Sequence, residues 1–342
     1  MRFVLISVLA CIIAQPATAE PFDLGPVEAE ILSGRLGKIE AVTIEQHGKA
    51  VYQRRFGDVG KSGLHDIRSA GKSITALAVG LAIADGKLAS VDAPVWPLLG
   101  AAESDPHADI TVRDLLTMSS ALDCDDGEPK SPGQEEKMYH RKEWRSFAMA
   151  LPLAANYQRD SKGYGRWSYC TAGIFLLGQM VQTAVDERFD LYVQRRLFDP
   201  LGIENVEWRR SASGEVQSGG QLKIGAAELA RIGRLVLDGG RWQGQQLVPE
   251  SWVREMLQPH RQVGTNVHYG YLWWFWPIKS PIGYQPSWLM QGNGGNMVAI
   301  FRDYDAVIVV QSSNYNKSDA NTQSNRIIEA ALAALPTPTE KH

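Results

Sequence analysis

The sequence has few cysteines and no excess of charge of either sign. Only 3 of its 342 residues are cysteine, and 35 basic side chains face 38 acidic ones, for a formal net charge of −3. Because the basic residues are scattered singly among acidic ones, we expect no nucleic acid as a partner. The sequence also has no C-x-x-C or H-E-x-x-H pattern, and its 7 histidines are widely spaced. We therefore expect no metal ion.

Long hydrophobic runs are absent after the first residues of the chain. Arg2 is followed by the apolar stretch FVLISVLACIIA and then by QPATAEP. A basic start, a short apolar core and a small-x-small triplet ending at Ala19 are typical of a signal peptide over residues 1–19. Apolar residues continue after Cys11, which favours simple secretion over a lipid anchor. We expect a periplasmic or secreted protein without a stable membrane anchor.

Removal of such a signal leaves two cysteines, Cys124 and Cys170. In an oxidising compartment the pair is a candidate disulfide. Two buried free thiols are the alternative, and the spacing of the residues does not decide between them.

Strand patterns lie at both ends of the chain and helical patterns lie between them. An alternating segment at 39–56 predicts a hairpin that turns at His47-Gly48. We therefore expect an α+β fold whose antiparallel sheet is built from both ends of the chain, with a mostly helical region inserted. The sheet domain would comprise residues 20–92 and 285–342, and the helical domain residues 93–284. Further strands are predicted at 287–291, 296–302 and 306–312, and helices at 69–83 and 325–335.

Gly71-Lys72-Ser73 has the letters that end a phosphate-binding loop. That loop needs a glycine five positions before Gly71, where the chain has Asp66. The expected βαβ context is missing as well, so we exclude a nucleotide and expect no cofactor.

The same stretch contains Ser69 and Lys72, an S-x-x-K pattern at the start of an apolar helix. Residues three apart lie on one face of a helix, so the amine can reach the hydroxyl. A buried lysine is costly unless it has a partner or a task, and a nearby amine can help to activate a serine nucleophile.

Two more segments could complete an active site. Tyr169 lies just ahead of the apolar stretch TAGIFLLG, and we expect a nearby ammonium to lower its pKa so that it acts as a general base. Asn293-Gly294-Gly295 precede a strand, where glycines permit close backbone approach. A backbone N–H just after them could join that of Ser69 in an oxyanion hole. Alone, the first segment is more typical of a core tyrosine and the second of a plain turn.

In this order, the segments resemble the serine β-lactamase and penicillin-binding-protein superfamily. The stretches IRSAGKSIT, ITVRDLLTMSSAL, YCTAGIFLLG, SGGQLKIGAAELARIGRLVLDGG and GNGGN carry the resemblance over most of the chain. The most similar branch holds class C β-lactamases, D-aminopeptidases, family VIII-type esterases and 6-aminohexanoate-dimer hydrolases. The resemblance implies an antiparallel sheet flanked by helices, a helical region, and a site in the cleft between them.

The resemblance also implies roles for single residues. Ser69 would be the acylated nucleophile, Lys72 its proton-transfer partner and Tyr169 the base, while the N–H groups of Ser69 and Asn296 would form the oxyanion hole. The family's Y-x-N has become Tyr169-Cys170-Thr171, which puts the shorter Thr171 hydroxyl where an amide would orient the substrate. A disulfide between the two cysteines would pin this loop.

The third motif departs from the family as well. Its lysine or histidine is replaced by Asn293, beside Gly294 and Gly295, which weakens the case for penicillin-type substrates. The aromatic run from Tyr269 to Pro277 is interpreted as the wall of an apolar cleft or as core packing.

These observations favour an exported serine hydrolase that cleaves a small ester or amide through an acyl-enzyme on Ser69. A true β-lactamase, which would take a lactam, and a D,D-peptidase or D-aminopeptidase are alternatives. A non-catalytic binding protein of the same fold is a further one. A Ser-His-Asp triad is disfavoured because the sequence has no G-x-S-x-G.

Overall fold

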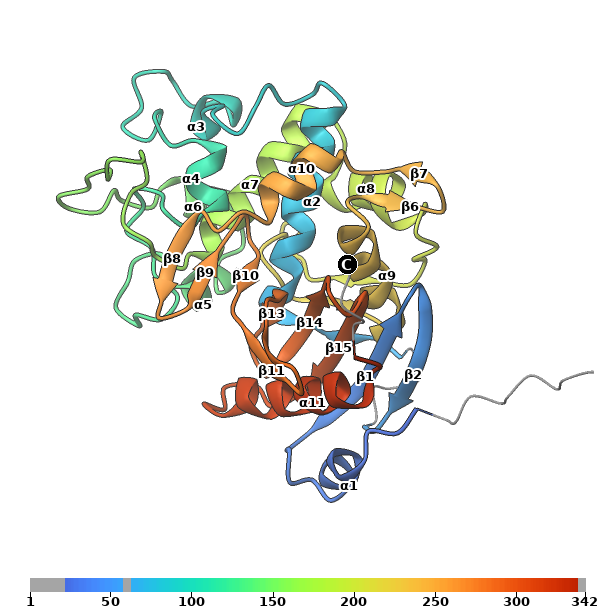
Figure 1. Ribbon diagram of the computed structural model, residues 1–342. Helices are drawn as coiled ribbons and strands as arrows, with labels where there is room; N and C mark the ends of the chain where they lie inside the picture. The colour runs from blue at the N-terminus through green and yellow to red at the C-terminus, as the bar shows by residue number, and fades with distance from the viewer. Residues whose placement is uncertain (1–21, 58–62, 338–342) are drawn as a thin grey trace, which may run out of the picture.

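The computed structural model of the protein describes residues 22–57 and 63–337 (Figure 1). The predicted signal peptide, residues 1–19, lies outside the described residues. A β-sheet with α11 and α1 on one side forms one part of the molecule, and a group of helices around α2 and α7 forms the other.

Eight antiparallel strands form the main sheet, in the order β2-β1-β15-β14-β13-β10-β9-β8. β1 near the start of the chain pairs with β15 near its end, which confirms the predicted α+β fold with a sheet built from both ends. The strands are β1 (Ile39–Gln46), β2 (Lys49–Arg55), β8 (Arg261–Gly264), β9 (Val267–Tyr269), β10 (Trp274–Phe275), β13 (Trp288–Gly292), β14 (Asn296–Phe301) and β15 (Ala306–Ser312).

The predicted first hairpin is present, with its turn at the expected dipeptide. His47 and Gly48 have φ values of 51° and 72°, between β1 and β2. Positive φ at both central positions gives a two-residue turn whose twist matches that of the strands, and glycine adopts it at little cost.

The central strands are buried on both faces, and their alternate residues enter two different cores. Met297 and Phe301 of β14 pack with α11 (Ala320–Ala334) and α1 (Pro26–Leu32). Val298 and Ile300 lie in the second core, on the side of α9 (Ala226–Leu237). Burying each such side chain stabilises the fold by about 1.5–3 kcal/mol. The sheet is therefore a rigid platform for the residues at its ends.

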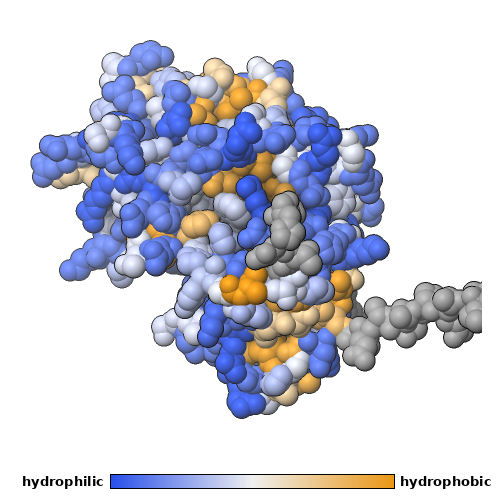
Figure 2. All heavy atoms as spheres, viewed as in Figure 1, coloured by the Kyte–Doolittle hydropathy of each residue, from blue (hydrophilic) through white to orange (hydrophobic). Residues whose placement is uncertain are grey.

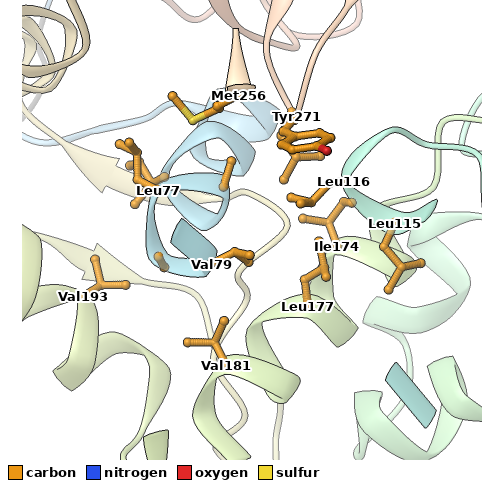
Figure 3. Packing of buried hydrophobic residues seen from close by; sticks show 14 of the residues in the cluster. Leu77, Val79, Leu115, Leu116, Ile174, Leu177, Val181, Val193, Met256 and Tyr271 are labelled. Carbon is orange, nitrogen blue, oxygen red and sulfur yellow. The ribbon is translucent and has the colours of Figure 1, made fainter. Parts of the chain in front are cut away.

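The helical part is built around two apolar helices, α2 (Lys72–Ala84) and α7 (Thr171–Val185). Figure 3 shows Val79 of the first helix and Ile174 and Leu177 of the second among the side chains of one buried cluster. A helix that is apolar nearly all round must be buried, which explains why neither helix lies on the surface. The remaining helices are α3 (Val95–Leu98), α4 (Val112–Leu116), α5 (Glu135–Tyr139), α6 (Trp144–Met149), α8 (Phe189–Val193), η2 (Gln194–Phe198) and α10 (Glu250–Met256).

The region expected to be mostly helical, residues 93–284, also contributes β8, β9 and β10 to the main sheet. These strands have only two to four residues each and lack strict alternation, so no strand pattern marks them in the sequence. The smaller sheets consist of β3 (His65–Asp66), β4 (Glu207–Trp208) and β5 (Leu222–Ile224), of β6 (Arg241–Trp242) and β7 (Gln245–Gln246), and of β11 (Ile278–Ser280) and β12 (Gly283–Gln285).

Hydrophilic residues cover most of the surface seen in Figure 2, and hydrophobic residues form separate patches over both parts of the molecule. Among residues 22–57 and 63–337, no helix combines the length and the apolar character needed to span a bilayer.

Candidate active site

Ser69 and Lys72 lie at the junction of a short 3-10 helix, η1 (Arg68–Gly71), with α2. Lys72 Nζ lies 2.9 Å from Ser69 Oγ and donates a 2.6 Å hydrogen bond to the carbonyl oxygen of Gly219. The lysine is 1% exposed. A nucleophile and its amine thus face each other across one helical turn, as the spacing predicts.

A tight backbone contact supports this turn from the other side. Gly220 has φ 141°, and a Cβ there would lie 3.3 Å from the Cα of Ser69 and 2.9 Å from the carbonyl oxygen of Arg68. The preceding Gly219 supplies the acceptor for Lys72. Sequence reasoning did not single out this glycine pair, although two adjacent glycines in the stretch SGGQ were a visible signal for close approach.

Tyr169 directly precedes α7 and lies over the amine. Lys72 Nζ is 5.0 Å from the centre of the tyrosine ring. Trp274 stacks on the other side of the residue, with ring centres 5.9 Å apart and planes 25° apart, and Trp167 lies 6.1 Å away. Trp273 is 1% exposed. The aromatic run is therefore core up to Trp273, while the half-buried Trp274 packs against Tyr169.

The pKa of Tyr169 moves in the direction opposite to our expectation. Burial raises it, and the positive charge of Lys72 and the hydroxyl of Ser69 only partly offset that effect. The expected lowering of the Tyr169 pKa is therefore wrong. Burial destabilises the phenolate by more than the nearby ammonium stabilises it, so the neutral phenol is favoured. The resting side chain is a neutral phenol.

The segment around Asp126 is fastened to Tyr169 and its two successors. Cys124 and Cys170 are joined by a disulfide, the first of the two alternatives left open by the sequence. The N–H of Asp126 donates to the carbonyl oxygen of Tyr169 at 2.8 Å. Its Oδ2 accepts from the N–H of Thr171 at 2.9 Å and from the hydroxyl at 2.6 Å. Thr171, a predicted substrate-binding residue, is fully buried and its hydroxyl is committed to Asp126.

Asp126 itself is a residue that the sequence did not mark. Burial raises the pKa of its carboxyl group to about 6, while the charge of Lys72 opposes this and that of Glu135 adds to it. Its Oδ1 is buried and has no hydrogen-bond partner among the described residues. A carboxyl group that titrates near neutral pH and interacts with the lysine is thus part of the site.

The third predicted segment, at Asn293-Gly294-Gly295, approaches the nucleophile through the glycine just before it. Gly292, the last residue of β13, lies so close to η1 that a Cβ would collide with the carbonyl oxygen of Ile67. The next residue, Asn293, lines the same cleft as Ser69. Its Nδ2 donates to Asn316 Oδ1 at 2.7 Å, and its Oδ1 accepts from the Asn316 N–H at 2.8 Å. The Asn293 amide is therefore occupied on both sides.

The other residues of this segment support the hairpin between β13 and β14. Gly294 and Gly295 have φ values of 87° and 84° and pack against Tyr315 and α11. Asn296 is 1% exposed and pairs with Gly292 across the two strands. Its side chain bonds the carbonyl oxygens of Asn293 and Ser312. The structure thus places Asn293 in the cleft and the other three residues behind it.

Ser69 opens into a cleft of about 430 Å³ between the sheet and the helical part. Its wall carries three acidic residues and one arginine beside the asparagine pair: Asp126, Glu135, Glu136, Arg68, Asn293 and Asn316. No group of three or more histidine, cysteine, aspartate or glutamate side chains within 22–57 and 63–337 is arranged to hold a metal ion.

The Beta-lactamase family model matches residues 40–333, which is most of the chain. The chain belongs to the Beta-lactamase family. The match includes Ser69, Lys72, Tyr169 and the Gly292 turn, so the residues brought together in the cleft all lie within the region that defines membership.

Individual relatives agree with this assignment. The chain is 25% identical over 200 residues to the 6-aminohexanoate-dimer hydrolase of Paenarthrobacter ureafaciens, which covers 56% of this chain and 50% of that protein. The chain thus matches half the length of this relative.

Solved structures show the same fold. A Bacillus anthracis protein with a provisional assignment as a 6-aminohexanoate-dimer hydrolase superposes with a TM-score of 0.72 at 20% identity, over 87% of this chain and 80% of that one. The D-stereospecific amidohydrolase of a Streptomyces species gives 0.68 at 17% identity, over 92% and 100%. These likenesses agree with the β-lactamase/transpeptidase-like fold expected from the sequence.

Proposed function

We propose that this Beta-lactamase-family chain is a serine hydrolase that cleaves a small ester or amide through an acyl-enzyme on Ser69. The observation that carries the proposal is the 2.9 Å contact between Ser69 Oγ and a lysine amine that is almost fully buried. Such a lysine is costly to the fold and needs a task. Two of the similar proteins are named for hydrolysis of amides, which supports the reaction type.

Acylation begins with the Ser69 hydroxyl. In the reactive form of the site Lys72 has given up its proton, and its amine takes the proton of Ser69 Oγ as the oxygen attacks the substrate carbonyl. Tyr169, a neutral phenol because its pKa is raised, gives its proton to the leaving oxygen or nitrogen. The scissile bond breaks, and the products of this step are an ester on Ser69, an ammonium on Lys72 and a phenolate on Tyr169.

Deacylation reverses these roles with water as the nucleophile. The phenolate of Tyr169 takes a proton from water, whose oxygen attacks the acyl carbon. Lys72 returns its proton to Ser69 Oγ as the acid product leaves. Both residues end in their starting forms, so the cycle needs no further base.

The developing negative charge on the carbonyl oxygen needs donors. We assign the N–H of Ser69, which lies in the first helical turn and lacks an acceptor within it, and the N–H of Asn293. Asn293 replaces Asn296 in this role because it follows the glycine that touches η1 and lines the cleft with Ser69.

Labelling with a fluorophosphonate followed by peptide mass mapping tests the nucleophile. We expect the label on Ser69 and a loss of activity of about a thousandfold or more in Ser69→Ala. Ser104→Ala is the matched control because Ser104 is exposed. Label on another residue, or an unimpaired Ser69→Ala enzyme, would refute the proposal, and acylation without turnover would indicate a binding protein instead.

The assigned role of Tyr169 predicts a dependence on the leaving group. Tyr169→Phe should lower kcat/KM, which reports acylation, by about a hundredfold or more for an amide and much less for a 4-nitrophenyl ester, because nitrophenolate leaves without a proton, while deacylation slows for both. Equal losses on both substrates would contradict the general-acid role. Turnover of nitrocefin at rates similar to those of good esters would favour a true β-lactamase.

We also propose that the protein is exported and works in the periplasm or outside the cell. The signal-like residues 1–19 and the disulfide between Cys124 and Cys170 support this location, since such bonds persist in oxidising compartments.

A further inference from the structure

Arg68, the residue before the nucleophile, forms part of the cleft wall, and its charge is not used by the proposed reaction. It lines the cleft together with Ser69, Asn293 and Asn316, and its side chain is 33% exposed. It is the one arginine or lysine among the described residues that form the wall of this cleft. We infer that Arg68 is a carboxylate-binding subsite and that the substrate is an ester or amide carrying a carboxylate.

The guanidinium of Arg68 is held in place before any substrate arrives. Its Cζ lies 4.4 Å from the centre of the Tyr315 ring. That ring is itself fixed, because its hydroxyl donates to the carbonyl oxygen of Asp66 at 2.8 Å and its face stacks on His65. Stacking on an aromatic face orients the planar guanidinium and reduces what is lost when it binds a planar anion.

The contact of Arg68 with Asp66 leaves the outer edge of the guanidinium for a ligand. Arg68 Nε lies 3.2 Å from Asp66 Oδ2, and no other carboxylate among the described residues pairs with it. A guanidinium has two further nitrogens on the opposite edge, spaced to donate to both oxygens of a carboxylate. The geometry therefore suits a carboxylate better than an uncharged group.

The backbone of Arg68 adopts a conformation that is unfavourable for arginine. Its φ is 51°, in the left-handed region, which costs a residue with a side chain about 1 kcal/mol or more. The neighbouring chain enforces it, since the Gln221 N–H donates to the Arg68 carbonyl oxygen at 3.2 Å and Gly220 packs against the same peptide. Such strain at a cleft residue is typical of a position held for binding.

The rest of the cleft defines where a carboxylate can lie. Both polar atoms of the Asn293 side chain are engaged by Asn316, so the Asn293 amide does not compete for the ligand. Asp126 and Glu135, which line the same cleft, repel an anion. A substrate carboxylate is thus confined to the neighbourhood of Arg68. This subsite supplies the positive charge for the carboxylate that the third motif lacks.

Because this inference rests on the proposed hydrolase function, its test uses matched substrate pairs. The first pair is mono-4-nitrophenyl glutarate and 4-nitrophenyl valerate, which differ by a carboxylate on the acyl side. The second pair is 3-acetoxybenzoate and 3-acetoxybenzamide, which differ on the leaving-group side. In at least one pair the wild type should prefer the carboxylate by about tenfold to hundredfold in kcat/KM, the value of a charged hydrogen bond.

Arg68→Gln should abolish that preference, mainly through KM, and leave the neutral partner within about threefold. Arg68→Lys should retain only part of it, because lysine lacks the planar fork. Arg254→Gln, which removes one exposed positive charge far from the nucleophile in the sequence, is the matched control and should change nothing. No preference in the wild type, or an equal loss on both members of a pair, would overturn the subsite.

The two proposals fail separately. Turnover of the neutral esters that disappears in Ser69→Ala supports the hydrolase function whatever happens at Arg68. If the wild type hydrolyses none of the four, the hydrolase proposal fails for such substrates. Calorimetric titration of the Ser69→Ala protein with glutarate and with valeramide then decides the subsite alone. Binding of glutarate that Arg68→Gln weakens about tenfold or more supports it, and equal binding of both compounds overturns it.

Discussion

Removal of the disulfide between Cys124 and Cys170 should weaken both the fold and the site. The bond joins residues 46 positions apart. In the chain-entropy model, a closed loop of this size restricts the unfolded chain by about 4 kcal/mol at room temperature. With a urea dependence of about 3 kcal/mol per molar, this corresponds to a shift of the unfolding midpoint by roughly 1 M.

The Cys124→Ser/Cys170→Ser variant suits this test because it retains other contacts. Cys170 is the N-cap of α7, where its sulfur accepts from the Gly173 N–H at 3.2 Å. Serine is a good N-cap, so the cap itself is not lost. The midpoint can be followed by tryptophan fluorescence, since the chain has 10 tryptophans. We expect the variant to unfold at lower urea and to ignore reductant, and the wild type to approach it when reduced.

Activity provides the second measurement for the same variant. The bond of Asp126 to the Tyr169 carbonyl oxygen and the bond of Ser168 Oγ to the Cys124 carbonyl oxygen, at 2.7 Å, remain available. The segment that carries Tyr169 should thus stay near its position but move more, and kcat should fall while KM changes little. Coincident unfolding of oxidised and reduced wild type would refute the reasoning, because the loop would then be held without the bond.

Three further predictions concern stability. Burial raises the pKa of Asp126 to about 6, so ionisation costs stability, and the wild type should lose stability relative to Asp126→Asn as the pH rises from about 4 to above 6, in urea unfolding at each pH. Gly292→Ala should abolish activity and destabilise the fold by about 1–3 kcal/mol, because its Cβ would meet a backbone carbonyl, whereas Gly264→Ala, whose Cβ meets only ordinary contacts at 3.4 Å, should be tolerated in the same thermal scan. Arg234→Met should lower the unfolding free energy by about 3–5 kcal/mol at neutral pH, because it leaves Glu45, a buried partner 3.0 Å away, without its positive charge. The loss should be smaller in acid, where Glu45 takes up a proton readily because burial raises its pKa. Equal losses at both pH values in calorimetry would contradict that account.

Much of the fold follows from local patterns. The hairpin with His47-Gly48 at its turn, the strands β14 and β15, and the helix that carries Lys72 all form where periodicity and turn residues predict them. In each case the signal extends over at least six residues or includes a turn that few residue types can form. β8, β9 and β10 are shorter than this, and the pairing of β10 with β13 joins them to the rest of the sheet.

In the candidate site, too, local sequence patterns predict some features and not others. Ser69 and Lys72 could be paired from the sequence because side chains three residues apart lie on the same face of a helical turn. The Tyr169 pKa could not be predicted, because it depends on how much water the surrounding tryptophans and the Asp126 segment exclude.

The glycines of the third segment show why close approach has to be seen. Gly292, Gly294 and Gly295 look alike in the sequence, yet only Gly292 touches the nucleophile turn, while the other two form the bend after it. Which glycine makes the contact depends on where β13 ends relative to η1, and this register is set by pairing across the whole sheet.

Arg68 is the most consequential residue that local reasoning passed over. In the sequence, Arg68 is simply a charged residue at the start of a helix, next to the S-x-x-K pattern. Its place in the cleft wall depends on a left-handed φ, held by contacts with Gly220 and Gln221 about 150 residues away, and on a tyrosine near the other end of the chain. The third motif lacks its cation, but the cleft does not, because a positive charge has reached it from the nucleophile turn. Substrate choice in this chain therefore has to be judged from the assembled cleft, where a missing lysine in one motif can be offset by an arginine in another.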